Sequence, residues 1–112
     1  MFPKKNRITK TGFDALLKKG SVFHSPYFSL RYSKKDGSLP QFAFVVSKKV
    51  AKNAVERNIL RRRGFSSLRE LGVLEKNGKW NGFTGAFFFK KEAKSLNFQE
   101  IKKKIEELLK KI

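Results

Sequence analysis

Apolar residues recur along the chain with two different periods, and these periods predict its secondary structure. Between positions 27 and 33 they alternate with polar residues, which places Phe28, Leu30 and Tyr32 on one face of a strand. The run that begins at Gln41 is apolar on both faces, which predicts a strand at the centre of a sheet. The segments predicted as strands are 21–24, 27–33, 41–46 and 83–89.

The last helix is predicted from apolar residues at intervals of three and four. They are Phe98, Ile101, Ile105, Leu108 and Ile112. Either Ser95 or Asn97 can cap this helix, and Glu100 stands three residues after Asn97, as in a capping box. The segment is therefore expected to pack one face on the sheet.

Two earlier segments also have helical spacing. The first covers residues 11–19, with Thr11 as its expected cap. The second runs from position 53 to about 71, and the phase of its apolar residues shifts at Gly64, so we expect a kink or a break there.

The order of the predicted elements is α-β-β-β-α-β-α. A hairpin turn of the Asp-Gly type at residues 34–38 joins the second and third strands. This order predicts a four-stranded sheet with three helices packed on it, an α/β (α+β) fold. A chain of 112 residues suffices for one compact domain, so a single domain over 1–112 is expected.

The composition adds a strong positive charge to this picture. Lys and Arg number 27 against 9 acidic residues, a formal net charge of +18, which favours a polyanionic partner. The 12 phenylalanines argue for a packed core rather than a disordered basic tail. A merely solvated surface and an acidic membrane surface are the alternatives for this charge.

Several classes of protein are disfavoured. The chain has no cysteine, which excludes disulfides and thiolate metal sites. Its charged N-terminus is unlike a signal peptide, and no apolar run is long enough for a membrane span, so a cytoplasmic location is expected. His24 has no sequence partner, and no carboxylates pair at a metal-binding spacing. We expect neither a catalytic residue nor a metal site in this chain.

The strongest candidate for a binding site in this sequence is a basic helix. At 100° per residue, Arg57, Asn58, Arg61 and Arg62 fall in one sector of about 140°, and this sector is expected to face outward. Val55, Ile59 and Leu60 lie on the other side and are expected to face the sheet. Arginine matches phosphate oxygens with planar, bidentate donors. The predicted RNA-binding residues, which include the preceding turn, are Lys48, Lys49, Lys52, Arg57, Asn58, Arg61, Arg62 and Arg63. A solvated helix face is the alternative interpretation.

Most of the aromatic residues are expected in the core. A four-stranded sheet with its helices on one face nevertheless leaves the other face partly open, and an exposed aromatic ring there can stack unpaired bases. Phe13 and Arg31 are the preferred candidates for such a groove.

One stretch of sequence carries a family pattern. It reads Phe44-Val45-Val46-Ser47-Lys48-Lys49-Val50, then Ala54-Val55-Glu56-Arg57-Asn58, then Arg61-Arg62. With Asn6-Arg7-Ile8 and the pair Lys19-Gly20, it resembles the protein component of bacterial ribonuclease P over nearly the whole chain. Three departures from the pattern are Ile59 and Phe65, where arginines are usual, and one additional residue between Val50 and Ala54.

The resemblance implies a fold and a function. The fold is a two-layer sandwich with a left-handed βαβ crossover, similar to one domain of ribosomal protein S5. The implied partners are a large catalytic RNA, which faces the arginine-asparagine helix, and precursor tRNA, whose 5′ leader lies in the cleft beside the first helix. Candidates for this cleft are Phe13, Arg31 and Phe44. Hydrolysis is then performed by Mg²⁺ bound mainly by the RNA, and no DNA or membrane partner is expected.

Two other functions remain open from the residues. A structural RNA-binding protein of the ribosomal type needs the same basic surface but has no role in cleavage. A stand-alone metal-dependent nuclease is less consistent with the sequence, because it needs paired carboxylates.

Overall fold

The computed structural model describes residues 4–34, 39–75 and 78–112, and it confirms the predicted order of helices and strands. Two short 3-10 helices are additional. The hairpin turn predicted at 34–38 lies almost wholly outside the described residues. The elements are η1 (Lys4–Asn6), α1 (Lys10–Lys19), β1 (Ser21–His24), β2 (Phe28–Lys34), β3 (Gln41–Val45), α2 (Ala54–Glu70), β4 (Phe83–Phe89), η2 (Lys91–Ser95) and α3 (Phe98–Lys110).

The four strands form one mixed sheet in the order β1-β2-β4-β3. β2 runs antiparallel to β1 and β4, whereas β3 is parallel to β4. The parallel pair is connected through α2, which gives the βαβ unit that the family resemblance implies.

The prediction that β3 is a central strand is wrong, because it lies at the edge of the sheet. Its two faces are buried to different extents, since Ala43 and Val45 on the outer face are only half-buried. Phe42 and Phe44 are buried on the core side, while the N-terminal segment covers part of the outer edge, where Arg7 forms an isolated parallel bridge with Phe42. β2 and β4 are the central strands.

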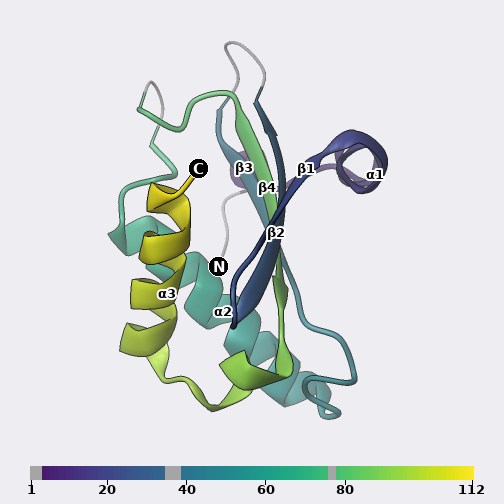
Figure 1. Cartoon of the computed structure of the whole chain (residues 1–112), viewed down its shortest axis with the longest axis vertical. Helices are drawn as coiled ribbons and strands as arrows, with labels where there is room; N and C mark the ends of the chain where they lie inside the picture. The colour runs from purple at the N-terminus through teal and green to yellow at the C-terminus, as the bar shows by residue number, and fades with distance from the viewer. Residues whose placement is uncertain (1–3, 35–38, 76–77) are drawn as a thin grey trace.

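Helices α2 and α3 cover one face of the sheet, and α1 lies alone on the opposite face (Figure 1). The main core fills the space between the sheet and the α2–α3 layer. Phe28, Phe42, Phe83 and Phe87 are each at most 1% exposed there, and burying a side chain of this size stabilises the fold by about 1.5–3 kcal/mol. The predicted strand pattern is confirmed, since Phe28 and Leu30 are fully buried on this side.

The cap of α3 is one of the two predicted, whereas Thr11 is not the cap of α1. Asn97 and Glu100 form the predicted capping box at the start of α3. Helix α1 begins one residue earlier than predicted, because Thr9 is its cap and accepts a hydrogen bond from the Gly12 amide. The side chain of Asn53 caps α2 through the amide of Val55.

Helix α2 continues through Gly64, so the break that the sequence allowed there does not occur. The glycine serves packing instead. A Cβ on Gly64 would lie 2.5 Å from the ring of Phe44, a distance that only a hydrogen at this position avoids. Glycine thus allows α2 to lie close against β3.

No helix in the described parts of the chain has both the length and the apolar character that crossing a membrane requires.

Candidate nucleic-acid interface

The connector between β3 and α2 displays three lysines. Val50 and Ala51 are buried, and both of their amides donate to the carbonyl of Ser47 at 3.1 Å, which closes a tight turn. The lysines around these two anchors, Lys48, Lys49 and Lys52, are exposed. The local fold therefore presents three cations beside the N-terminus of α2, where the free amides also favour anions.

Arg57 holds this connector against the helix. Its Nη1 donates to the carbonyls of Ala51 at 2.9 Å and Lys52 at 2.8 Å, and the side chain is half-buried. The expectation that Arg57 points freely outward therefore needs correction. Part of its guanidinium shapes the surface that carries the lysines, and the remaining N–H groups stay available to a ligand.

The buried stripe of α2 differs from the predicted one. It comprises Leu60, Gly64, Ser67 and Leu68, which recur at helical spacing. Of the three apolar residues expected to face the sheet, only Leu60 does so, whereas Val55 is 64% and Ile59 is 41% exposed. The predicted inward face is rotated around the helix from the observed one. The prediction considered only apolar side chains, whereas the buried stripe also contains a glycine and a serine.

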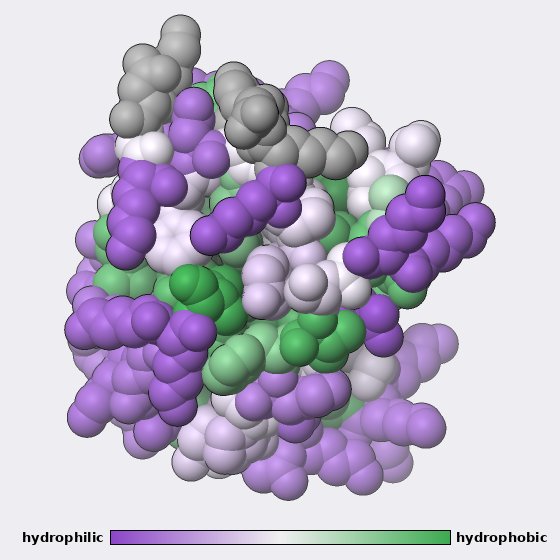
Figure 2. Space-filling model, turned by 45° about the horizontal axis from the view of Figure 1, so that its top comes forward, coloured by the Kyte–Doolittle hydropathy of each residue, from purple (hydrophilic) through white to green (hydrophobic). Residues whose placement is uncertain are grey.

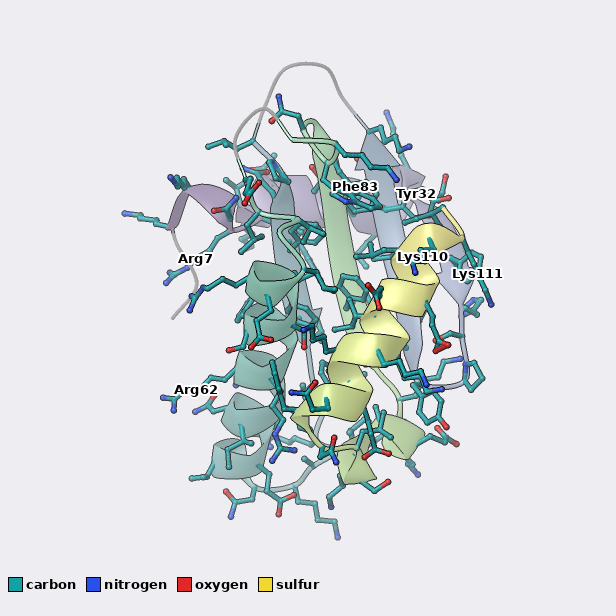
Figure 3. The ribbon with its side chains drawn as sticks, turned by 90° about the vertical axis from the view of Figure 1, so that its left-hand side faces the viewer. Arg7, Tyr32, Arg62, Phe83, Lys110 and Lys111 are labelled. Atoms are coloured by element: carbon teal, nitrogen blue, oxygen red, sulfur yellow. The ribbon has the colours of Figure 1, made fainter. Side chains whose placement is uncertain are left out.

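Three of the remaining basic-helix residues, Asn58, Arg61 and Arg62, lie on one side of α2. Asn58 accepts a hydrogen bond from Nη2 of Arg61, which fixes both side chains on one face. Arg62 is exposed and extends away from the molecule on the same side as Arg7 (Figure 3). Arg63 differs from these, because its Nη1 donates to the carbonyl of Leu96 at 3.2 Å and thus ties α2 to the segment before α3. The structure does not bring Arg63 to the surface that the others form.

A pocket of about 630 Å³ lies between the N-terminal segment, β3 and α2. Its walls combine residues from all three. They are Arg7, Ile8, Phe42, Ala43, Phe44, Asn58, Arg61, Arg62 and Phe65. The sequence prediction included three of these as RNA-binding residues but missed Phe65, although Asn58, Arg61, Arg62 and Phe65 share one helical face by their spacing. The contribution of Arg7 and Ile8 depends on the tertiary fold, which no local pattern reveals.

Of the three residues predicted for the leader cleft, Phe13 and Arg31 both lie at α1, whereas Phe44 does not. Phe13 packs on Phe88 of β4, with ring centroids 6.1 Å apart, on the face covered by α1. Arg31 donates from Nη1 to the carbonyl of Leu17 at 3.3 Å, which holds the end of α1 to β2. Phe44 lies on the opposite face, stacked on Phe87 with centroids 5.1 Å apart, so its place beside Phe13 needs correction.

A second pocket, of about 520 Å³, does lie beside α1. Polar and small residues dominate its walls. The polar ones are Thr9, Thr11, Lys19, Ser33, Gln41 and Thr84. Sequence reasoning missed these residues, because their side chains are brought together only where α1 crosses β2, β3 and β4.

Some of the acidic residues lie in surface ion pairs. Lys94 pairs with Glu56 at 3.5 Å, and Lys102 pairs with Glu70 at 3.1 Å. Within residues 4–34, 39–75 and 78–112, no three His, Cys, Asp or Glu side chains cluster as metal ligands do. His24 is exposed on the edge strand β1.

Hydrophilic side chains surround a small apolar centre on the face shown in Figure 2.

Comparison with solved structures shows which proteins share this fold. The fold is similar to that of the RNase P protein of Staphylococcus aureus, with a TM-score of 0.80 and 22% identity over 96% of this chain and 94% of that one. The RNase P protein of Thermotoga maritima matches with a TM-score of 0.79 and 24% identity over 95% and 96% of the two chains.

Sequence comparisons agree with this likeness of fold. A Ribonuclease P protein component from a Nitratiruptor species is 51% identical over 55 residues, which cover 48% of this chain. The match spans about half, 47%, of the length of that relative. The sequence model of the family described as Ribonuclease P matches residues 2–112. The chain therefore belongs to the ribonuclease P protein family.

Proposed function

We propose that this chain is the protein subunit of ribonuclease P, which assists a catalytic RNA in removing the 5′ leader of precursor tRNA. The observation that carries the proposal is the exposed basic surface of the connector and α2, in a chain of this family. Lys48, Lys49, Lys52 and Arg62 supply its charge. We further propose that the protein works in the cytoplasm, where it meets the RNA.

The basic surface acts by charge and not by side-chain catalysis. A folded RNA brings its phosphates close together although they repel one another. Protein cations that replace condensed counterions reduce this repulsion. The same cations disfavour Mg²⁺ at this surface, so we assign the Mg²⁺ that activates water for hydrolysis to RNA ligands. The protein then lowers the Mg²⁺ concentration that the RNA needs.

The pocket beside α1 is the proposed path of the leader. Its hydroxyl and amide groups, from Thr11, Ser33, Gln41 and Thr84, suit the sugars and phosphates of a single strand, and Lys19 adds a cation. Phe13 and Arg31 support this site by holding α1 on the sheet. Their role is to position the wall of the groove, and part of each side chain remains accessible.

Reconstitution tests the proposal. Precursor tRNA is incubated at low Mg²⁺ with the RNA subunit alone, the protein alone, and both. We expect efficient cleavage at the mature 5′ end only with both. Unchanged cleavage after addition of the protein contradicts the proposal, and stoichiometric sedimentation with ribosomal subunits then points to a structural ribosomal role. Cleavage by RNA-free protein points to a stand-alone nuclease.

A further inference from the structure

The 630 Å³ pocket between the N-terminal segment, β3 and α2 has the form of a ligand site rather than a packing defect. Its volume falls within the range of about 300–1,000 Å³ that is typical of small-ligand pockets. It is built from three separate parts of the chain, and two of its rim residues, Arg7 and Arg62, point outward on the same side of the molecule (Figure 3).

The inner wall of the pocket is apolar and held rigidly. Phe65 is half-buried and meets the ring of Phe44 edge to face, with centroids 4.9 Å apart and planes at 89°. Phe44 is itself stacked on Phe87 in the core, at an interplanar angle of 9°. The ring of Phe65 therefore has its orientation set by the core while part of it remains accessible. A preorganised ring of this kind stacks a flat ligand at little entropic cost.

A strand edge adds in-plane hydrogen-bonding groups. β3 is an edge strand, and Ala43, near its middle, lines the pocket. Among the described residues, the outer side of β3 is bridged only by Arg7, at Phe42. Backbone groups farther along β3 can therefore pair with donors and acceptors on the rim of a planar ligand.

The mouth of the pocket is cationic. Arg7, Arg61 and Arg62 contribute to its walls, and the described residues that line it include no Asp or Glu. Asn58 holds Arg61 by accepting its hydrogen bond, which leaves the Asn58 amide nitrogen as a donor for the ligand. A ligand that fits these features is planar and apolar on its faces, polar at its edges and linked to a phosphate. Nucleotides combine all of these properties.

We propose that this pocket takes one unstacked nucleotide of the RNA partner. The base packs on Phe65 with its edge toward β3, and its phosphate meets Arg61 and Arg62 at the mouth. The inference rests on the proposed function, because it assigns a subsite within the RNA-binding surface. It adds a contact by shape and stacking to a surface otherwise dominated by charge.

The pocket can be tested in the full-length protein with small probes. The amide signals of ¹⁵N-labelled protein are followed by NMR during titration with AMP, ribose 5-phosphate or inorganic phosphate. AMP is expected to shift the amides of Ala43 and Phe65, whereas the two base-free probes leave those amides in place. Phe65→Leu preserves an apolar contact with Phe44 but removes the flat ring. It is expected to weaken AMP binding about fivefold or more, and Phe23→Leu, at a half-buried phenylalanine outside the pocket, serves as the matched control.

A second measurement needs no variant. The complex with the catalytic RNA is irradiated at 254 nm and digested with nuclease and trypsin, and nucleotide adducts are located by mass spectrometry. The tryptic peptide Gly64–Arg69 contains Phe65 as its one aromatic residue, and we expect an adduct on it. Adducts confined to other peptides, or ribose 5-phosphate shifts equal to those of AMP, overturn the nucleotide pocket. Retained stimulation of cleavage at low Mg²⁺ in that case shows that the proposed function itself survives.

Discussion

Gly64 of α2 lies directly against the ring of Phe44 of β3. A Cβ on Gly64 would approach Cδ1 and Cε1 of this ring at 2.5 Å and Cζ at 2.8 Å. The ring cannot easily retreat, because Phe87 and Phe65 hold it from two other directions. The spacing between α2 and the sheet, and hence the position of the basic surface, depends on this contact.

Replacing Gly64 with Ala should therefore destabilise the protein, although alanine is the better helix former by about 1 kcal/mol. We expect a loss of about 1–3 kcal/mol in the free energy of unfolding, the usual cost of overpacking a core. Urea denaturation followed by circular dichroism measures it. Ser66→Ala, two residues along the same helix, should change stability little. A Gly64→Ala protein as stable as the parent would mean that α2 can move away from β3 without cost.

Asn6 joins the N-terminal segment to the rest of the fold. It is 1% exposed, and its Nδ2 donates to the carbonyl of Pro40 at 2.8 Å and to that of Leu74 at 3.4 Å. Asn6→Ala leaves buried carbonyls without this donor, so we expect a loss of about 1–3 kcal/mol in the free energy of unfolding.

The same change should also weaken RNA binding, because Arg7 and Ile8 lose their anchor. Filter binding to the catalytic RNA at fixed salt measures the effect. The matched control is Asn81→Ala, at an exposed asparagine. Undiminished RNA affinity of a destabilised Asn6→Ala protein would show that the N-terminal segment takes no part in the interface.

Arg57 and Arg62 should respond differently to substitution by alanine. Arg62 is exposed, so Arg62→Ala should leave the melting temperature unchanged and reduce the slope of log affinity against log salt by about 1. Arg57→Ala should in addition cost about 1–2 kcal/mol of stability, because Arg57 donates to the carbonyls of Ala51 and Lys52.

Thermal melts and RNA titrations at several salt concentrations separate these two effects. The double change Arg57→Ala with Arg61→Ala should reduce the salt slope by about one to two. An unchanged slope in both experiments would mean that this face of α2 does not contact RNA phosphates.

Phe13 is expected to matter for the leader. Phe13→Ala removes the ring that packs on Phe88, which loosens α1 over the neighbouring pocket. The affinity for precursor tRNA should therefore fall more than that for mature tRNA. Competition binding with both RNAs measures the ratio, and Phe98→Ala, at a half-buried phenylalanine on α3, is the control. Equal losses for both RNAs would assign Phe13 to the core alone.

Much of the fold could be predicted from periodicity and caps. The alternation around Phe28 and Leu30 and the capping box of Asn97 and Glu100 are local signals, and the structure confirms both. The edge position of β3 and the unbroken course of α2 depend on contacts between distant parts of the chain. The period of the apolar residues shows which of them share a face, but it does not identify the segment that covers that face.

The candidate site was predictable by charge more than by geometry. Lys48, Lys49 and Lys52 are exposed as expected, because the turn that presents them is local. Arg57 and Arg63 instead donate to backbone carbonyls, and the partner of Arg63, Leu96, is 33 residues away. Arginine density indicates a phosphate-binding surface, but only the fold shows which guanidinium groups are engaged within the protein.

We propose above all that this protein lowers the Mg²⁺ requirement of a catalytic RNA. The most direct test is the Mg²⁺ concentration that gives half-maximal cleavage of precursor tRNA by the RNA subunit, with and without saturating protein. We expect the protein to lower this concentration severalfold, and the Arg57→Ala, Arg61→Ala double variant to lower it less. An identical Mg²⁺ midpoint with and without the protein would contradict the account.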